Sequence, residues 1–565
     1  MQSVDHSGAR AHEPLAADEE SSPLLSPTAA PQELPAPAPA LPPPHQPSSP
    51  TLTLNGDGTA SSSSSPSRPI TSTSSTVWTE ALTLLQLIAP IAIGSAIFNV
   101  TGVAETVAVG RLGTLELASQ GMAGLVVGIT ALAPFMGAIT ALDTLCSQAV
   151  GGGESTKKMA GVYLQRALVI VWMMCIPLSL IWWNIGLFLK NFGVDDAMIP
   201  LIVLYLRGFI PSILIVVTSE CIKKFLYAQG LMRFSTYVVA ITSPVQVGLL
   251  FLLTFHPAFN LGFVGLPVAY FITQSIVLAL YVYMIVYIDG HQCWVPWSTE
   301  CFRHWEQIFR LALPGVVLVY SILGTSYVTM LGAATIGREA IAAQNAAAGI
   351  QAIFSMLSLS IGTGTATRVG NLLGANNAAL AKLSFSISVT LAALLGVFNC
   401  SALIIFRHSW STLFSSDPAI IEGVASAIIP IAIAQLGSAV AAGCSGTLRG
   451  QGRQRITAGI RMVTSYLIAI PSGFIFALKF KLGITGLWFG VALGELSSAI
   501  IELYYVSRTN WEHEAKKAQE RLVSRAAHMG IRYETSSGGS DSEDLISSTA
   551  SASEDDDDVE ARVQT

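Results

Sequence analysis

The chain has 565 residues, of which 51% are hydrophobic and only 12% are charged. Soluble domains carry about 25% charged residues, so this composition excludes an ordinary soluble protein and indicates a chain built for lipid. The formal net charge of -6 includes an acidic run at Glu554 to Asp558, and the absence of a basic cluster excludes a typical nucleic-acid-binding protein.

Residues 1–76 are rich in proline, serine and alanine and lack apolar periodicity. This composition predicts a disordered cytosolic tail. Within it, Glu20 followed by Leu24 and Leu25 resembles an acidic dileucine sorting signal that an adaptor reads. Such short patterns also occur in ordinary disordered segments, so both interpretations stay open.

Twelve apolar stretches follow, and each is long enough to cross about 30 Å of hydrocarbon at 1.5 Å per residue as a helix. Helices are expected because isolated strands would leave backbone groups unpaired in lipid. The stretches lie near residues 81–103, 117–141, 160–186, 199–218, 234–255, 263–288, 310–332, 340–366, 383–406, 419–445, 458–478 and 484–506. The predicted fold class is an all-α polytopic membrane protein with twelve transmembrane helices.

The predicted domains follow from these stretches. They are the cytosolic tail 1–76, a six-helix N-lobe at 77–288, a cytosolic linker at 289–304, a six-helix C-lobe at 305–507 and a cytosolic acidic tail at 508–565. A charged helical stretch at 512–525 opens the last tail, which is expected to be mobile. Lysine and arginine are more numerous in the loops on the N-terminal side, eleven against six, which predicts that both termini are cytosolic.

An internal repeat relates the two lobes. Gly113, Leu117, Ala118 and Gln120 align with Gly337, Ile341, Ala342 and Gln344 at an offset of 224 residues, and further anchors follow in the same order at nearly the same offset. Because each repeat holds an even number of helices, both halves enter the membrane in the same orientation. Such duplicated halves suit alternating access, in which two bundles rock about a site between them.

Several motifs together resemble the multidrug and toxic compound extrusion (MATE) family over roughly residues 80–507, with the eukaryotic, fungal branch most similar. The motifs are Gly110-Arg-Leu-Gly113, Leu142-Asp-Thr-Leu-Cys-Ser-Gln148, Arg368-Val-Gly-Asn-Leu-Leu-Gly-Ala375 and Gly446-Thr-Leu-Arg-Gly-Gln-Gly-Arg-Gln454. The resemblance implies two six-helix lobes that form a V and the export of organic compounds in exchange for H⁺ or Na⁺.

The sequence departs from that branch at its acidic positions. Two glutamates typical of the seventh helix are replaced by Ile322 and Tyr327, and an acid of the tenth helix is replaced by Ser438. In contrast, Glu105 stands eight residues before Gly113, where bacterial and archaeal relatives often carry an aspartate. We therefore expect that cation coupling has moved to the N-lobe.

Glu105 is the principal candidate for cation coupling, because an ionised carboxylate within an apolar span needs a partner or a proton. In the alternative interpretation it lies near the outer interface and pairs with Arg111. Glu495 is the second candidate, since it shares a helical face with Ser498 and Glu502. Alternatively, Glu502 simply lies near the inner surface.

The candidate substrate-cavity residues are polar side chains on the predicted helices. They are Thr101, Gln120, Tyr320, Tyr327, Gln344, Asn345, Gln435 and Ser438. The tyrosines on the seventh helix could face the polar stripe on the tenth, although close helix packing explains small polar residues equally well. A neutral C-lobe cavity favours amphipathic or uncharged substrates. We interpret Asp143 as structural, bound to backbone or to basic inner-loop residues.

The predicted function is a secondary active exporter of small organic or xenobiotic compounds in the lipid bilayer, of the vacuolar or the plasma membrane. No cofactor and no metal site are predicted, and seven cysteines without metal-ligand spacing suit core positions. A membrane enzyme is disfavoured because all nine histidines fall outside the apolar stretches. A sensor that kept the fold but lost transport, or an exporter of a lipid-linked compound or metabolite, remains an alternative.

Overall fold

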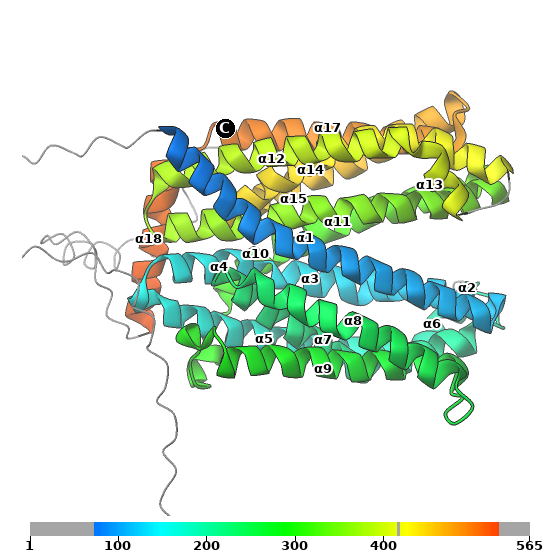
Figure 1. Cartoon of the computed structure of the whole chain (residues 1–565), viewed down its shortest axis with the longest axis horizontal. Coiled ribbons are helices and arrows are strands. Elements are labelled where there is room, and N and C mark those ends of the chain that lie inside the picture. The colour runs from blue at the N-terminus through cyan, green and yellow to red at the C-terminus, as the bar shows by residue number, and fades with distance from the viewer. Residues whose placement is uncertain (1–72, 192, 415–417, 530–565) are drawn as a thin grey trace, which may run out of the picture. The chain divides into compact units, whose positions relative to one another are not determined.

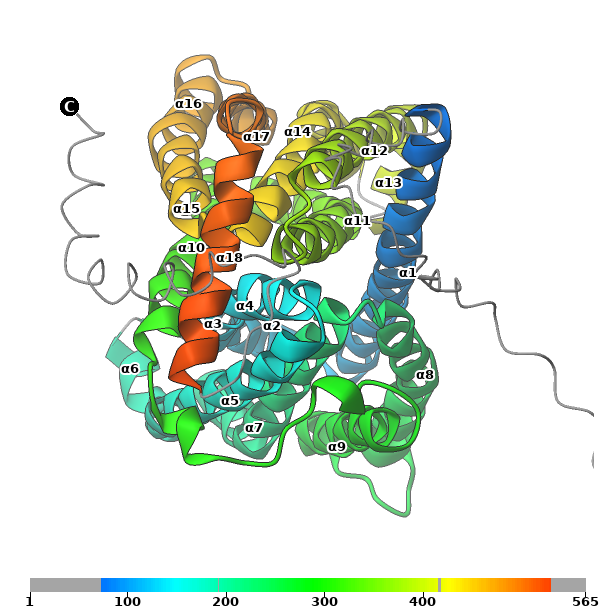
Figure 2. The ribbon, with the colours of Figure 1, turned by 90° about the vertical axis from the view of Figure 1, so that its left-hand side faces the viewer.

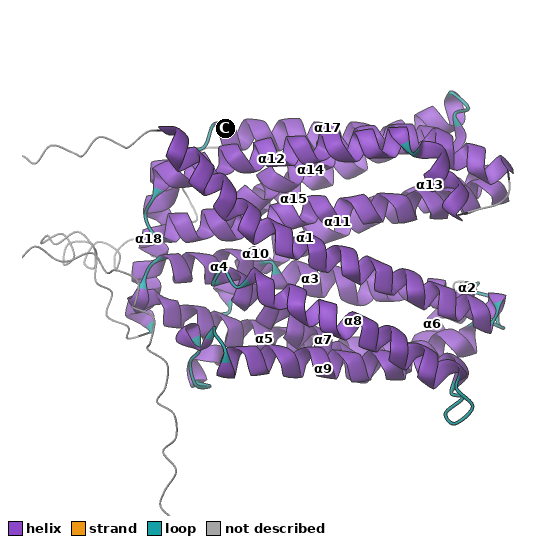
Figure 3. Ribbon diagram, in the orientation of Figure 1, coloured by secondary structure: helices purple, strands orange, loops and turns teal. Residues whose placement is uncertain are grey.

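The computed structural model describes residues 73–191, 193–414 and 418–529. In these ranges the regular structure is helical, and twelve helical spans are long and apolar enough to cross a membrane (Figure 3). The twelve predicted spans are confirmed. The tail with Glu20, Leu24 and Leu25 lies outside the described residues.

The N-lobe contains the first six spans. They are α1 (Thr73–Leu112); a broken span made of α2 (Thr114–Val127), the π-helix η1 (Gly128–Leu132), α3 (Ala133–Ile139) and α4 (Ala141–Gly151); α5 (Glu154–Trp183); α7 (Ile199–Ala228); α8 (Met232–Phe255); and α9 (Gly265–Tyr287). The short helices α6 (Ile185–Asn191), η2 (Gly262–Val264), η3 (His291–Cys293) and η4 (Thr299–Phe302) lie in the connections.

The C-lobe contains the other six spans. They are α10 (Glu306–Ile336); α11 (Arg338–Gly374); α12 (Ala378–Ile405); α14 (Pro418–Gln451); a broken span made of α15 (Gln454–Val463), the π-helix η5 (Thr464–Ala469), α16 (Ile470–Phe474) and the π-helix η6 (Ile475–Lys479); and α17 (Gly483–Ser507). The short α13 (Arg407–Phe414) follows α12, and α18 (Trp511–His528) follows the last span.

Proline explains two of the breaks within spans. Pro134 and Pro471 stand in the first turn of α3 and α16, directly after the π-helical turns η1 and η5. A proline inside a helix has no N–H, and its ring collides with the carbonyl four residues earlier. The preceding turn widens to π geometry, which accommodates the ring without ending the span.

The first helix crosses between the lobes (Figure 1). Near its start, Leu84 and Ile88 are buried in a cluster with C-lobe residues that include Ile361 and Ile387. Beyond Pro90 the helix packs on α8 of the N-lobe, and the Thr236 hydroxyl donates to the Pro90 carbonyl at 2.6 Å. Thus α1 is a physical link between the two bundles.

The charged stretch after the last span forms α18, which lies across one end of both lobes (Figure 2). Trp511, Ala515 and Ala518 belong to a buried cluster of the C-lobe, whereas Leu522 and Ala526 belong to the N-lobe core. The expectation of a mobile stretch is therefore wrong for α18, because its apolar face is buried in both cores. We call this end of the bundle the α18 end.

Polar contacts also hold α18 in place. Gln519 donates to the Gly374 carbonyl of α11 at 2.6 Å, and Arg521 donates to the Gln451 carbonyl of α14 at 3.1 Å. Burial lowers the pKa of Arg521 to about 10, because desolvation disfavours the charged guanidinium and Arg525 repels it. Arg521 remains a cation near neutral pH and serves as a buried donor.

Candidate functional site

Glu105 lies in the half of α1 that is remote from α18, where three helices of the N-lobe meet. Gln120 of α2 donates from Nε2 to Glu105 Oε1 at 3.0 Å, and the Tyr205 hydroxyl of α7 donates to the same oxygen at 3.5 Å. Arg111 does not pair with Glu105; its guanidinium lies over the Phe251 ring. The carboxylate is therefore held by neutral donors from its own lobe, which lower the cost of placing it in the membrane.

The C-lobe repeats this arrangement without the charge. Gln344 Nε2 lies 3.4 Å from Thr329 Oγ1, and both residues stand 224 positions after Gln120 and Glu105, the offset of the internal repeat. The same helix pair thus carries the same polar contact in each lobe. Only the N-lobe copy contains a carboxyl group, which can gain or lose a proton as a threonine hydroxyl cannot.

The two candidate tyrosines of α10 contact the N-lobe rather than Gln435 and Ser438 on α14. The Tyr320 hydroxyl donates to the Ile129 carbonyl of η1 at 2.8 Å. The Tyr327 hydroxyl lies against Gly128, whose missing side chain leaves the room. The widened turn η1 therefore receives both tyrosines, which places them between the lobes, where a substrate cavity is expected in this architecture.

The other cavity candidates are spread over separate positions. Gln435 of α14 donates to Gln351 Oε1 of α11 at 2.8 Å and is fully buried, so it joins helices within the C-lobe. Ser438 is half-buried and Asn345 is exposed. Thr101 is half-buried and donates to the Ile97 carbonyl of its own helix at 3.2 Å. The structure thus brings Glu105 and Gln120 together but does not join these four to them.

Glu495, the second coupling candidate, belongs to a cluster of charges inside the C-lobe. Arg461 of α15 donates from Nη1 to Glu495 Oε2 at 2.8 Å. Arg461 also forms a longer ion pair with α17: its Nε lies 3.8 Å from Oε1 of Glu502, which follows Glu495 on the same helix. Glu502 is fully buried within the protein.

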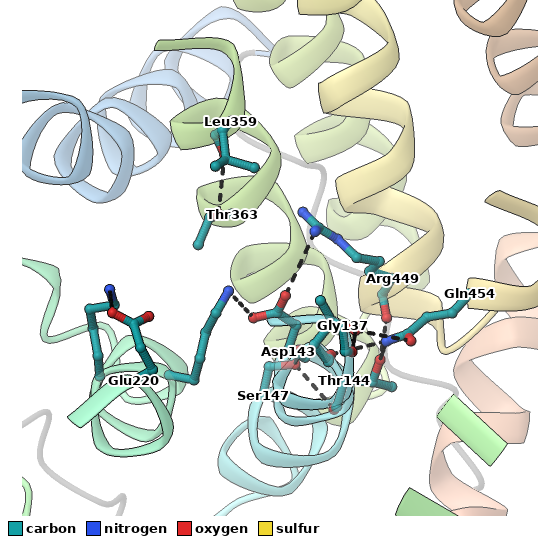
Figure 4. Close-up of polar contacts among 12 residues, drawn as sticks. Gly137, Asp143, Thr144, Ser147, Glu220, Leu359, Thr363, Arg449 and Gln454 are labelled. Carbon is teal, nitrogen blue, oxygen red and sulfur yellow. Dashed lines mark hydrogen bonds and ion pairs between the residues drawn. The ribbon is translucent and has the colours of Figure 1, made fainter. Parts of the chain in front are cut away.

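At the α18 end, charged residues join the two lobes. Asp143 of α4 pairs with Lys224 of its own lobe at 2.8 Å and faces Arg449 of α14 at 3.9 Å (Figure 4). Nearby, Arg368 of α11 donates through Nε and Nη2 to the two oxygens of Glu80 on α1, at 2.8 and 2.6 Å. Planar, bidentate pairs of this kind fix orientation as well as charge.

Uncharged contacts extend this interface. The Thr144 hydroxyl donates to the Arg449 carbonyl at 2.5 Å, Gln148 donates to the Gly450 carbonyl at 2.9 Å, and Gln454 donates to the Thr140 carbonyl at 3.0 Å. Most of these residues lie in the sequence motifs that resemble the MATE family. Three of the four motifs, at residues 142–148, 368–375 and 446–454, therefore serve one purpose in this structure, which is to join the lobes at the α18 end.

Glycine permits the close approach of α4 and α11 in this interface. A side chain at Gly151 would collide with the backbone of Asn371, and one at Gly374 would collide with the backbone of Gln148. The helices therefore touch through their backbones, as small residues allow in membrane proteins.

The sequence interpretation missed three partners of these sites. Tyr205 carries no spacing signal that separates it from the other tyrosines. Glu80 and Arg461 were detectable as charges at the start or inside of an apolar span, which is a rare and costly position. The interpretation of Asp143 as bound to basic inner-loop residues agrees with its contacts to Lys224 and Arg449.

Comparison with known proteins gives consistent matches. A family model described as MatE matches residues 90–252 and 315–475, more than half of the chain. An uncharacterized transporter of Schizosaccharomyces pombe is 31% identical over 445 residues, which cover 79% of this chain and 82% of the relative. Multidrug and toxin extrusion protein 1 of Xenopus tropicalis is 28% identical over 453 residues, covering 80% of this chain and 78% of the relative.

Solved structures agree in fold. The eukaryotic MATE transporter AtDTX14 matches with a TM-score of 0.73 and 26% identity, covering 79% of this chain and all of that chain. An outward-facing MATE family transporter of the MOP superfamily matches with a TM-score of 0.70 and 16% identity, covering 78% of this chain and 97% of that chain. This integral multi-pass membrane protein, which has fungal relatives, therefore belongs to the MATE family of transporters.

Proposed function

We propose that the protein exports small organic compounds in exchange for protons, by alternating access of its two lobes. Family membership supports export of small molecules, and the relatives include multidrug and toxin extrusion proteins. The proposal of proton coupling rests on Glu105, a carboxylate within a membrane span that Gln120 and Tyr205 of the same lobe hold by hydrogen bonds.

The contacts of Glu105 favour H⁺ over Na⁺. Both partners donate to the carboxylate through an amide N–H and a phenolic O–H. A hard metal cation needs a shell of several oxygen ligands, whereas in this arrangement Gln120 and Tyr205 turn an N–H and an O–H group to the carboxylate. A proton needs only the carboxylate oxygen itself.

The substrate is expected to be amphipathic or uncharged. Positions where acids attract cations in the eukaryotic branch hold Ile322, Tyr327 and Ser438, and Tyr327 turns its hydroxyl toward η1 of the other lobe. The two tyrosines between the lobes offer aromatic faces and hydroxyl groups, which suit such compounds.

The predicted orientation indicates to which side of the membrane the described conformation is closed. The residues that join the lobes gather at the α18 end, which faces the cytosol if both termini are cytosolic. The described state then has its cytosolic side sealed. Transport requires these contacts to separate in the opposite state.

The test is flux in proteoliposomes under an imposed pH or Na⁺ gradient, with a panel of neutral amphiphiles and organic cations. Wild type is expected to move at least one neutral amphiphile when a proton gradient is imposed, and Glu105→Gln is expected to lose this gradient-driven flux. Glu116→Gln, at the same end of the N-lobe, is the matched control and retains it.

Other outcomes contradict parts of the proposal. Undiminished flux in Glu105→Gln removes Glu105 from coupling, with Glu495 as the next candidate. Flux that is driven by a Na⁺ gradient and not by a pH gradient shows that Na⁺, and not H⁺, is the coupling ion. Ligand binding without flux in wild type supports a sensor instead.

We further propose residence in the vacuolar or plasma membrane, with Glu20, Leu24 and Leu25 read by a sorting adaptor. A fluorescently tagged chain is expected to change its membrane when Leu24 and Leu25 are both replaced by alanine. An unchanged distribution contradicts the adaptor proposal.

A further inference from the structure

Glu502 of α17 is a buried carboxylate of the C-lobe. It is fully buried, and neither of its oxygens accepts a hydrogen bond from any described residue. One helical turn earlier, the buried hydroxyl of Ser498 also has no hydrogen-bond partner among the described residues. An ionised carboxylate in such surroundings costs several kcal/mol unless a cation compensates it.

The cations around Glu502 are shared with other acids. Arg461 of α15 donates its short hydrogen bond to Glu495 at 2.8 Å and lies 3.8 Å from Glu502. The charge of Arg449 on α14 also acts on Glu502, and the thiol of Cys444, on the same helix as Arg449, is a further titratable group near it. One guanidinium cannot neutralise both Glu495 and Glu502. Whether Glu502 is ionised or protonated therefore depends on Arg449.

Arg449 stands between an acid of each lobe. Its Nη1 lies 3.9 Å from Asp143 Oδ2 in the N-lobe, and that oxygen accepts no hydrogen bond from a described residue. Asp143 already has Lys224 at 2.8 Å. When the lobes separate at the α18 end, Asp143 and Lys224 leave together as a neutral pair, whereas Arg449 stays with Glu502 in the C-lobe.

We propose that Glu502 is a proton-binding site whose occupancy is set by the contact between Asp143 and Arg449. While the lobes are joined, Arg449 is engaged with Asp143 and Glu502 holds a proton on its carboxyl group. When they separate, Arg449 turns its charge to Glu502, the O–H bond breaks, and the proton passes to water on the α18 side. Proton release and lobe separation therefore favour one another.

This site gives the C-lobe a titrating group although the acids of the eukaryotic branch are missing there. Its role in transport rests on the proposed proton exchange, but the linkage itself is a conformational property. It can be measured without substrate or flux, so a failure of the proposed function and a failure of this inference give different results.

The experiment is electron–electron distance measurement on the full chain in nanodiscs from pH 5 to pH 9. Spin labels replace two exposed residues at the end opposite to α18, Phe259 of the N-lobe and Phe480 of the C-lobe. Cys400, the least buried native cysteine, is changed to serine. Every variant also carries Glu105→Gln, so the proposed N-lobe site contributes nothing to the titration.

The otherwise unchanged chain is expected to show the long distance at low pH and a shorter one at high pH, as the α18 end opens. Glu502→Gln keeps the long distance across the range, because its neutral amide leaves Arg449 with Asp143. Asp143→Asn is a second, independent variant and shows the short distance across the range. Glu154→Gln, an exposed acid at the same end, titrates like the unchanged chain.

Two results would overturn the inference. Glu502→Gln could titrate with the same amplitude as the chain with Glu502 intact, which removes Glu502 as the proton site. Asp143→Asn could leave the titration unchanged, which removes the link through Arg449.

Discussion

At the scale of single residues, duplication of the lobes has preserved a hydrogen bond and not a charge. Glu105 and Gln120 meet in the N-lobe, and Thr329 and Gln344 meet at the corresponding place in the C-lobe. A hydroxyl there can bind its partner but cannot exchange a proton near neutral pH. The two lobes therefore differ at one corresponding contact, which includes an ionisable carboxyl group in the N-lobe and a hydroxyl group in the C-lobe.

This comparison gives a prediction for Gln120. Gln120→Leu removes the N–H that binds Glu105, and a hydrogen bond to a charged group contributes roughly 1.5–3 kcal/mol. Proton-driven flux is expected to fall about tenfold or more in proteoliposomes. Gln344→Leu, the matched change in the other lobe, is expected to change flux little. Equal losses in both variants would show that the glutamines only support packing.

Part of the site could be predicted from single residues. Glu105 stands out because a carboxylate is rare inside an apolar span, and Gln120 aligns with Gln344 through the repeat. Tyr205 could not be found, because its contact depends on how α7 packs against α1. The spacing of Glu495 and Glu502 was visible, but their shared cation Arg461 lies on a different helix.

At the scale of elements, α18 shows what hydropathy finds and what it misses. The transmembrane helices were predictable because lipid demands long apolar runs, whereas α18 is short and charged. Its buried residues Trp511, Ala515, Ala518 and Leu522 nevertheless recur at helical spacing and mark one apolar face. That face is narrow and rich in alanine, so it predicts an amphipathic helix without saying what the helix covers.

Leu522→Ala tests the attachment of α18 to the N-lobe. Leu522 is 1% exposed, and truncating a buried leucine costs roughly 2–5 kcal/mol. We expect the α18 end to open more readily, which shortens the distance between labels at Phe259 and Phe480. Lys516→Ala, on the exposed face of α18, is the control and leaves the distance unchanged. A lower melting temperature without a change in distance would limit α18 to a stabilising role.

At the scale of the whole described molecule, the two lobes meet through backbone contact as well as through charge. The overall architecture was predictable from the repeat, because two halves of six helices each must lie in the membrane in the same orientation. The interface was not predictable in detail, since glycine, threonine and glutamine motifs do not state which lobe they face. Only the fold brings Gly151 beside Asn371 and Gly374 beside Gln148.

Gly151→Ala is predicted to prevent this approach. The added methyl group would collide with the backbone of Asn371, which cannot rotate away as a side chain can. Flux is expected to fall at least tenfold while the protein still inserts and elutes as a single species in detergent. Gly248→Ala in α8 is the matched control, because nothing lies within 4 Å of the added carbon. Normal flux in Gly151→Ala would show that transport does not require this contact.

The position of α18 in the chain has a consequence for biosynthesis. A ribosome completes residues 511–528 only after all twelve spans have been made, so both bundles must insert and fold without this helix. The first docking of α18 is therefore a late step, and it requires both lobe surfaces to be correctly formed at the same time. A chain that stops before Trp511 leaves uncovered the apolar lobe surface that α18 otherwise buries, which includes Val369 and Phe385. Exposed apolar surface is the kind of feature that cellular quality control recognises.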